Sequence, residues 1–145
     1  MVLLPALMVL AWGGGASQSS DGAVIPSGQA HYYEGCGGCH GLNGVSVRAE
    51  IPVLRDRVGT YLCTREGRDY LVRLPNVAFA AMTDQQLADT LNFMVFTLGG
   101  ASSPADARPY GAEEVGALRR QPLKNTDLAQ LRGRILGRAL TSCGK

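Results

Sequence analysis

The sequence has 145 residues, which is enough for one domain with a modest hydrophobic core. Its formal net charge is only +2, so no strong positive field indicates a nucleic-acid partner. The chain has four cysteines and two histidines, so any metal-binding or redox chemistry is concentrated at very few positions.

Residues 1–16 (MVLLPALMVLAWGGGA) are apolar and uncharged, and the apolar run is too short to span a bilayer comfortably. A short apolar run that ends in small residues predicts a secretory signal, cleaved near Ala16, and hence an exported, periplasmic protein. Because its start lacks positive residues, two alternatives stay open. The true start lies upstream, or the segment is kept as a surface anchor, which would bring the protein to a membrane. Residues 17–27 have the composition of a linker.

The stretch YYEGCGGCHGLNG (residues 32–44) contains Cys36, Cys39 and His40 in the spacing Cys-x-x-Cys-His. In c-type haem attachment each thiol forms a thioether with one haem vinyl group, and the histidine becomes an axial iron ligand. A thioredoxin-like redox pair would require a βαβ context, and a zinc site would require a second ligand pair nearby. The sequence offers neither, so the motif predicts one covalent haem c. Export agrees with this, because such haem is attached outside the cytoplasmic membrane.

Helical periodicity, with no strand pattern of useful length, predicts an all-α fold. The expected helices cover residues 28–39, 65–74, 84–98, 112–121 and 126–140, and residues 51–54 lie in a loop. The clearest is the third: Thr83 is a good N-cap, Gln86 completes a capping box, and glycines 99 and 100 end the helix. Its apolar face consists of Leu87, Leu91, Met94 and Leu98.

Residues 101–145 form a basic C-terminal extension. It has eight lysines and arginines against four acidic residues: Arg108, Arg119, Arg120, Lys124, Arg132, Arg134, Arg138 and Lys145 against Asp106, Glu113, Glu114 and Asp127. The extension is expected to be helical. Its basic residues are either a docking segment for a larger complex or an ordinary solvated helix face, and the sequence leaves both possibilities open.

Residues 28–98 resemble the class I c-type cytochromes. The shared features are an aromatic residue four positions before the first motif cysteine, Cys-x-x-Cys-His-Gly, a proline in the following loop, and a capped last helix with an aromatic residue. The stretch YLVRLPNVAFAAMTDQQLADTLNFM also resembles a subgroup of small periplasmic cytochromes. The resemblance implies cytochrome c-like helices around one covalently bound haem in residues 28–100, with a helical C-terminal extension.

The resemblance also implies how the haem surroundings are built. Gly28 and Tyr32 would pack against the last helix of this region near Phe93, where glycine permits a close approach of the two backbones. The carbonyl of Pro52 would accept the Nδ1 hydrogen of His40, the proximal iron ligand. Such a bond fixes the ring and raises its basicity.

The distal iron ligand is expected to be a methionine sulfur, which favours the reduced iron. Met94 lies on the buried face of the helix, one residue after Phe93, and is the favoured ligand. Met82 is the alternative, although a hydrophobic staple with Leu87 gives it a structural role. His31, on the same helix as the motif, is a third and weaker alternative.

Cys63 and Cys143 belong to no metal-binding pattern. In an exported protein, leftover cysteines usually pair, so a disulfide between them is expected, with two unrelated cysteines as the alternative. The bond would tie the extension to the haem domain.

A covalent haem with two protein ligands has no open position for a substrate, so the expected function is one-electron transfer at the haem edge, without enzymatic catalysis. The redox partner would be a dehydrogenase that supplies electrons, or an oxidase or reductase that receives them. Two alternatives stay open. If no methionine reaches the iron, the open position makes the protein a minor peroxidase or a gas sensor. In the second alternative, the protein is a haem subunit of a larger oxidoreductase complex.

Overall fold

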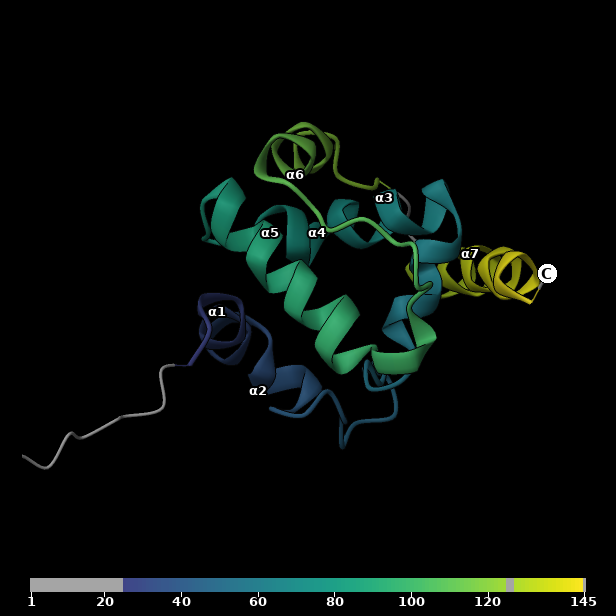
Figure 1. Cartoon of the computed structure of the whole chain (residues 1–145), viewed down its shortest axis with the longest axis horizontal. Coiled ribbons are helices and arrows are strands. Elements are labelled where there is room, and N and C mark those ends of the chain that lie inside the picture. Colours follow the sequence, from purple (N-terminus) through teal and green to yellow (C-terminus); the bar gives the residue numbers. More distant parts are fainter. Residues whose placement is uncertain (1–24, 125–126, 145) are drawn as a thin grey trace, which may run out of the picture.

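The computed structural model describes residues 25–124 and 127–144 (Figure 1). The predicted signal, residues 1–16, and most of the predicted linker lie outside the described residues. The α-helices are α1 (Ser27–Gly35), α2 (Gly37–His40), α3 (Arg65–Arg73), α4 (Pro75–Ala78), α5 (Asp84–Asn92), α6 (Ala112–Arg119) and α7 (Leu128–Cys143). Two 3₁₀ helices, η1 (Val58–Cys63) and η3 (Gly100–Ser102), and one π-helix, η2 (Phe93–Leu98), complete the fold. None of the described residues forms a strand, which confirms the expected all-α fold.

Helix α5 runs through the middle of the molecule, with α1 and α6 packed against it (Figure 1). The predicted capping box is present: Gln86 N donates to Thr83 Oγ1 (3.2 Å), and Thr83 N donates to Gln86 Oε1 (2.8 Å). The predicted apolar face is buried, at Leu87, Leu91, Met94 and Leu98. This helix therefore forms as its sequence pattern indicates and supplies the centre of the core.

The last six residues of the predicted helix 84–98 form the π-helix η2, which follows α5 directly, a difference from the predicted continuous α-helix. The N–H of Gly99 donates to the carbonyl of Met94 (2.8 Å), which is the i to i+5 spacing of a π-turn. Such wide turns are rare, and many of those that occur lie at functional sites. Met94 therefore lies in a locally irregular part of the helix.

Helix α1 packs tightly against α5. A Cβ on Gly28 would fall on the carbonyl oxygen of Asp89, so the glycine allows the two backbones to touch. Tyr32 is fully buried, and its ring centroid lies 5.3 Å from that of Phe93. These contacts confirm the expected packing of the first helix against the last helix of residues 28–98.

The predicted first helix, residues 28–39, is in fact two helices. The backbone leaves the helical conformation at Cys36 (φ −128°, ψ −32°), where α1 ends and α2 begins. Glycines at positions 35, 37 and 38 surround this break, and glycine is among the weakest helix formers. The break places Cys36 at the N-cap of the short helix that ends with His40.

Three further elements were not predicted: η1, α4 and the short η3. Pro75 disfavours helical backbone in Leu74 and so ends α3, as expected, but it also begins α4. At this first helical position the missing N–H costs nothing. Helix η1 is too short and too tightly wound to show the 3.6-residue period, although most of its residues are buried.

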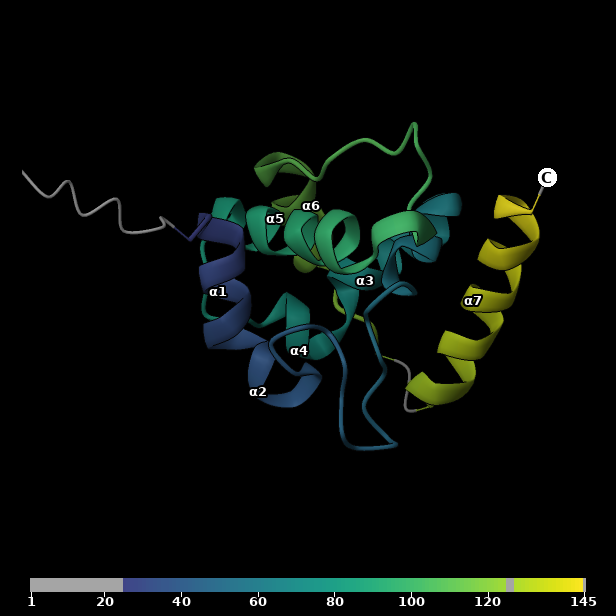
Figure 2. The same cartoon turned by 60° about the horizontal axis from the view of Figure 1, so that its bottom comes forward.

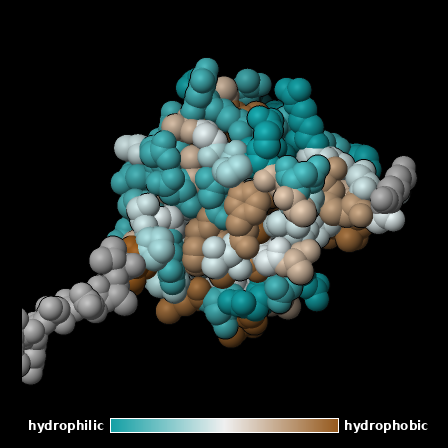
Figure 3. Space-filling view, in the orientation of Figure 1, coloured by the Kyte–Doolittle hydropathy of each residue, from teal (hydrophilic) through white to brown (hydrophobic). Residues whose placement is uncertain are grey.

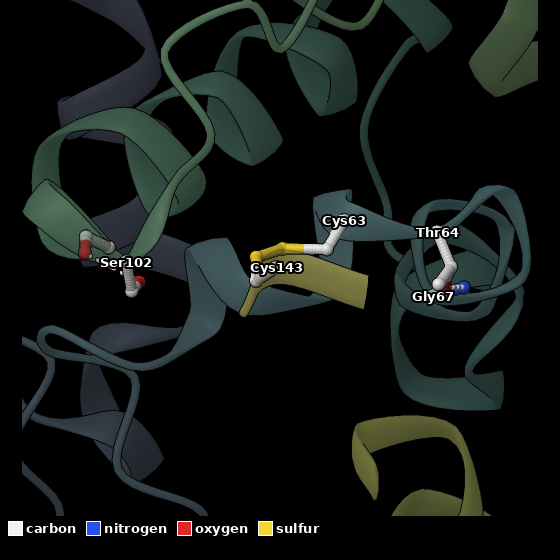
Figure 4. The surroundings of a disulfide bond; sticks show 6 residues. Cys63, Thr64, Gly67, Ser102 and Cys143 are labelled. Atoms are coloured by element: carbon white, nitrogen blue, oxygen red, sulfur yellow. Dashed lines mark hydrogen bonds between the residues drawn. A yellow bond between two sulfur atoms is a disulfide. The ribbon is translucent and has the colours of Figure 1, made fainter. Parts of the chain in front are cut away.

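The C-terminal extension packs on the rest of the chain: α6 contacts α3 and α5, and α7 contacts η1 and α3 (Figure 2). A disulfide joins Cys63, at the end of η1, to Cys143, at the end of α7 (Figure 4). Their Cα atoms are 5.4 Å apart, within the usual range for a disulfide, and the expected pairing is confirmed. Among the described residues, no helix combines the length and apolar character required to cross a membrane.

Arg68 of α3 holds the start of α6 in place. Its guanidinium donates to both carboxylate oxygens of Glu114, at 2.6 and 2.7 Å, and lies 4.0 Å from the ring centroid of Tyr110. The Arg68 side chain is only 12% exposed, so water screens this bidentate pair less than an ordinary surface ion pair. The extension is therefore anchored by specific polar contacts as well as by the disulfide.

Candidate haem-binding site

A cavity of about 890 Å³ lies between the loop after α2, the helices η1, α3 and α4, and helix α7. Its volume falls within the range of small-molecule and cofactor sites in proteins. The side chains that line it are mostly apolar, among them Leu54, Val58, Leu71, Leu74, Val77, Met94 and Leu136. Such a cavity suits a large, flat and mostly apolar ligand.

His40 lines this cavity, and Pro52 fixes its ring. The Nδ1 atom of His40 lies 2.9 Å from the carbonyl oxygen of Pro52. Because a carbonyl only accepts hydrogen bonds, Nδ1 carries the hydrogen and the lone pair of Nε2 is free. This is the bond that the sequence resemblance implies, and it leaves His40 ready to bind a metal through Nε2.

Cys36 and Cys39 are free thiols immediately before His40, the first partly buried and the second exposed. Burial raises the pKa of the Cys36 thiol, and the neighbouring Cys39 raises it further. A raised pKa opposes the thiolate that a reactive redox pair requires. Within the described residues no cluster of three or more His, Cys, Asp or Glu side chains could hold a metal ion, so the zinc alternative lacks ligands.

The two candidate methionines lie in different surroundings. Met94 is 8% exposed and lines the cavity together with His40. Met82 is not among the lining residues, and its methyl group lies against Gly35 of α1. Thr90 Oγ1 is 3.6 Å from the sulfur of Met82 but donates its hydrogen to the carbonyl of Gln86 at 2.8 Å. Of the two sulfurs, only that of Met94 belongs to a residue of the cavity wall.

Two relatives now identify the family. The chain is 30% identical over 129 residues to a protein named Cytochrome c-552 from Thermus thermophilus, which covers 77% of this chain and 82% of the relative. A second Cytochrome c-552 from Thermus thermophilus is 29% identical over 122 residues, covering 72% of this chain and 88% of the relative. This chain belongs to the class I c-type cytochromes. No model of a known protein family matches the sequence, and no solved structure matches it either.

This cytochrome carries one covalent haem c and is an electron carrier. Its residues fit that group on chemical grounds. Two free thiols stand in the attachment spacing, a histidine has its Nδ1 engaged and its Nε2 free, and an apolar cavity of sufficient volume adjoins the histidine. A thioether in the same cavity wall completes a ligand set that suits haem iron.

The sequence did not predict the polar side chains on the cavity wall. The rings of Tyr61 and Tyr70 stack with centroids 5.4 Å apart, and burial raises the pKa of both, that of Tyr61 to about 12. Arg132 of α7 and Arg57 also line the cavity, and neither forms an ion pair with another described residue. These residues come from separate elements, so no spacing in the sequence indicates that they meet.

His31 lies on α1, where its Nδ1 is 3.8 Å from a carboxylate oxygen of Glu34. It is not among the cavity-lining residues. The structure thus gives a bis-histidine haem no support, because the second histidine of the chain faces a different part of the molecule.

Apolar surface gathers near the motif loop. Leu42, Val45, Val47 and Val53 are exposed in the segment after α2, and Phe79 is exposed after α4. Figure 3 shows polar side chains over the upper part of one face, with apolar side chains in its middle and along its lower edge. Exposed apolar side chains that cluster beside a functional site are typical of contact surfaces.

Proposed function

We propose that this cytochrome passes single electrons in the periplasm, from a dehydrogenase to an oxidase or reductase, through a haem attached to Cys36 and Cys39. His40 would be the proximal iron ligand and Met94 the distal one. One observation carries the proposal: His40, oriented by Pro52, and Met94 line the same apolar cavity, and the thiol pair directly precedes the histidine. When bound, the haem supplies the one-electron chemistry.

The residues of the chain orient the group and exclude water. The Pro52 carbonyl holds the ring of His40, while Tyr32 and Phe93 hold α1 against the helix that carries Met94. Burial in an apolar cavity favours the less charged, reduced iron and so raises the reduction potential. The cations of Arg57 and Arg132 are suited to hold the two haem carboxylates.

Residues 28–100 would form the haem domain, with residues 101–145 as an extension that packs on it. The packing of α6 and α7 supports a self-contained carrier more than a projecting docking arm. The exposed valines and Leu42 in the loop beside His40 support a partly apolar contact with the redox partner. The disulfide between Cys63 and Cys143 supports an oxidising compartment outside the cytoplasm, in line with the predicted signal.

Acid acetone treatment of the purified holoprotein tests the attachment. The haem should stay with the protein, whose mass should exceed the mass of the chain by one haem. A C36S/C39S double variant should release its haem into the solvent under the same treatment. Extraction of haem from the unaltered protein would show that the thiols hold no covalent haem.

Carbon monoxide tests the ligation and separates the carrier from its alternatives. An iron with two protein ligands has no free position, so the reduced protein should bind carbon monoxide slowly. Rapid binding would indicate a five-coordinate iron and would favour the peroxidase or gas-sensor function.

A further inference from the structure

Arg119, the last residue of α6, holds the segment that joins α4 to α5. Its guanidinium donates hydrogen bonds to three carbonyl oxygens, those of Ala78 (2.9 Å), Ala80 (2.6 Å) and Met82 (2.8 Å). It also donates to a carboxylate oxygen of Asp84 (3.1 Å). Only 15% of the Arg119 side chain is exposed, so the contact is largely shielded from water.

The segment between α4 and α5 lacks the regular backbone hydrogen bonds of a helix. Residues 79–83 belong to no helix or strand, and the carbonyl of Ala80 has one local bond, from the N–H of Met82 (2.8 Å). The bonds from Arg119 add partners from a distant part of the chain. The three bonded carbonyls stand at alternate residues, and the planar fork of an arginine has enough fixed donors to reach all of them. Arg119 therefore sets the path of this segment.

This path matters because both ends of the segment lead to the haem cavity. Val77 lines the cavity just before the segment begins. At the other end, Thr83 caps α5, the helix that continues into the π-helical turn with Met94, which also lines the cavity. One guanidinium thus fixes the segment that lies in sequence between two residues of the cavity wall, Val77 and Met94.

We propose that Arg119 is a positioning residue for the haem cavity: by fixing residues 78–84 it keeps the wall residues on either side, Val77 and Met94, in place and so excludes water and small ligands from the iron. The proposal rests on the proposed function, in that this cavity holds the haem. It assigns to the C-terminal extension a role in tuning the redox centre that no residue of the motif fulfils.

The role can be separated from mere stability, because α6 has other anchors. Glu114 is bound by Arg68, Val115 is fully buried, and Gly116 allows the helix to approach Asp84 closely. Loss of the Arg119 guanidinium should therefore loosen the segment without detaching α6.

The test compares Arg119→Met with Arg120→Met in the holoprotein. Methionine keeps much of the apolar stem and removes the guanidinium. Arg120 is the matched control, because it is the next residue, carries the same charge and is exposed. Three quantities are measured: the rate of carbon monoxide binding to the reduced protein, the midpoint potential, and hydrogen exchange of the amides of residues 78–84.

Arg119→Met should bind carbon monoxide about tenfold faster or more, because four shielded, charge-assisted hydrogen bonds no longer fix the segment next to the wall. Its potential should fall as water gains access to the haem, and the amides of the segment should exchange faster. Arg120→Met should match the unaltered protein in all three measurements. Arg119→Lys keeps the charge but lacks the fork, so it should lie between the two and serves as the test variant if Arg119→Met yields no holoprotein.

The proposal is overturned if the Arg119 variants are less stable to heat yet keep the potential and the exchange rates of the unaltered protein. That result would make Arg119 a structural contact only. Failure of the proposed ligation is seen separately, as rapid carbon monoxide binding by the unaltered protein. The potential and the exchange rates still decide the role of Arg119 in that case.

Discussion

Met94 and Met82 allow a matched pair of substitutions, because leucine keeps most of the apolar volume of methionine and removes the sulfur. Met94→Leu should abolish the weak far-red band that methionine-ligated ferric haem shows. It should also lower the midpoint potential, because the soft ligand that favoured the reduced iron is gone. Visible spectra and a redox titration measure both effects.

Met82→Leu is the control. Met82 packs against Gly35 outside the cavity wall, so its replacement should cost about 1 kcal/mol of stability or less and leave the spectrum unchanged. The reverse pattern, in which Met82→Leu removes the band and Met94→Leu leaves it unchanged, would show that Met82 is the distal iron ligand.

Glu114 is expected to make stability depend on pH. Its hydrogen bonds with Arg68 hold the pKa of its carboxyl below the ordinary value of 4.5, so the folded state favours the charged form. A lowered pKa stabilises the fold above pH 4.5, and this contribution is lost as the pH falls through the folded-state pKa. Glu114→Gln should therefore destabilise the fold at neutral pH, and progressively less below pH 4.5. The cost should be only on the order of 1 kcal/mol, because about a third of the Glu114 side chain remains in solvent.

Denaturant unfolding of both proteins at several pH values measures this difference. Glu113→Gln is the matched control, since Glu113 is adjacent and exposed. A Glu114→Gln penalty that stays constant down to acidic pH would show that the carboxylate charge is not what stabilises the contact.

At the scale of helices, the contact between α1 and α5 depends on Gly28. Gly28→Ala would place a methyl group on the carbonyl of Asp89, so the helices must move apart, at a cost of roughly 1–3 kcal/mol. Gly133→Ala, in α7, meets open space and should instead stabilise the protein by about 0.5–1 kcal/mol through helix propensity. Denaturant unfolding compares the two variants, and a Gly28→Ala protein as stable as Gly133→Ala would contradict close packing at position 28.

The sequence predicted those helices whose signals are local. The capping box at Thr83, the apolar face that includes Leu91, and the end of α3 before Pro75 each depend on residues within a few positions, and each is present. Two features that the sequence did not predict depend on a distant partner or on rare geometry. The 3₁₀ helix η1 is stabilised by α7, far along the chain, and the π-turn at Met94 has no pattern of its own.

The candidate site divides in the same way. Cys36, Cys39 and His40 stand together in the sequence, and Pro52 follows from the family resemblance. By contrast, Arg119 acts on a segment 35 to 41 residues away, so neither spacing nor composition indicates that the two meet. The same holds for the tyrosines of the cavity wall.

At the scale of the whole molecule, α7 closes one side of the haem cavity. It lines the cavity with Leu128, Arg132 and Leu136, and its end is bonded through Cys143 to Cys63. Arg138 also pairs with Glu66, but both side chains are about half exposed, so this pair contributes little. The disulfide should therefore contribute more than this ion pair to holding α7 in place.

Replacing both cysteines in a C63S/C143S variant should lower the free energy of unfolding by roughly 3–5 kcal/mol, because the bond closes a loop of 80 residues and restricts the unfolded chain. The potential should fall as well, since a loosened α7 admits water to the cavity. Each single serine variant should lose nearly as much as the double variant, because either one breaks the bond. Arg138→Gln should cost less than about 1 kcal/mol and leave the potential unchanged. Additive losses in the two single variants would contradict a bond between the two cysteines. A reduction potential that is unchanged without the disulfide would mean that α7 stays on the cavity without its covalent tie.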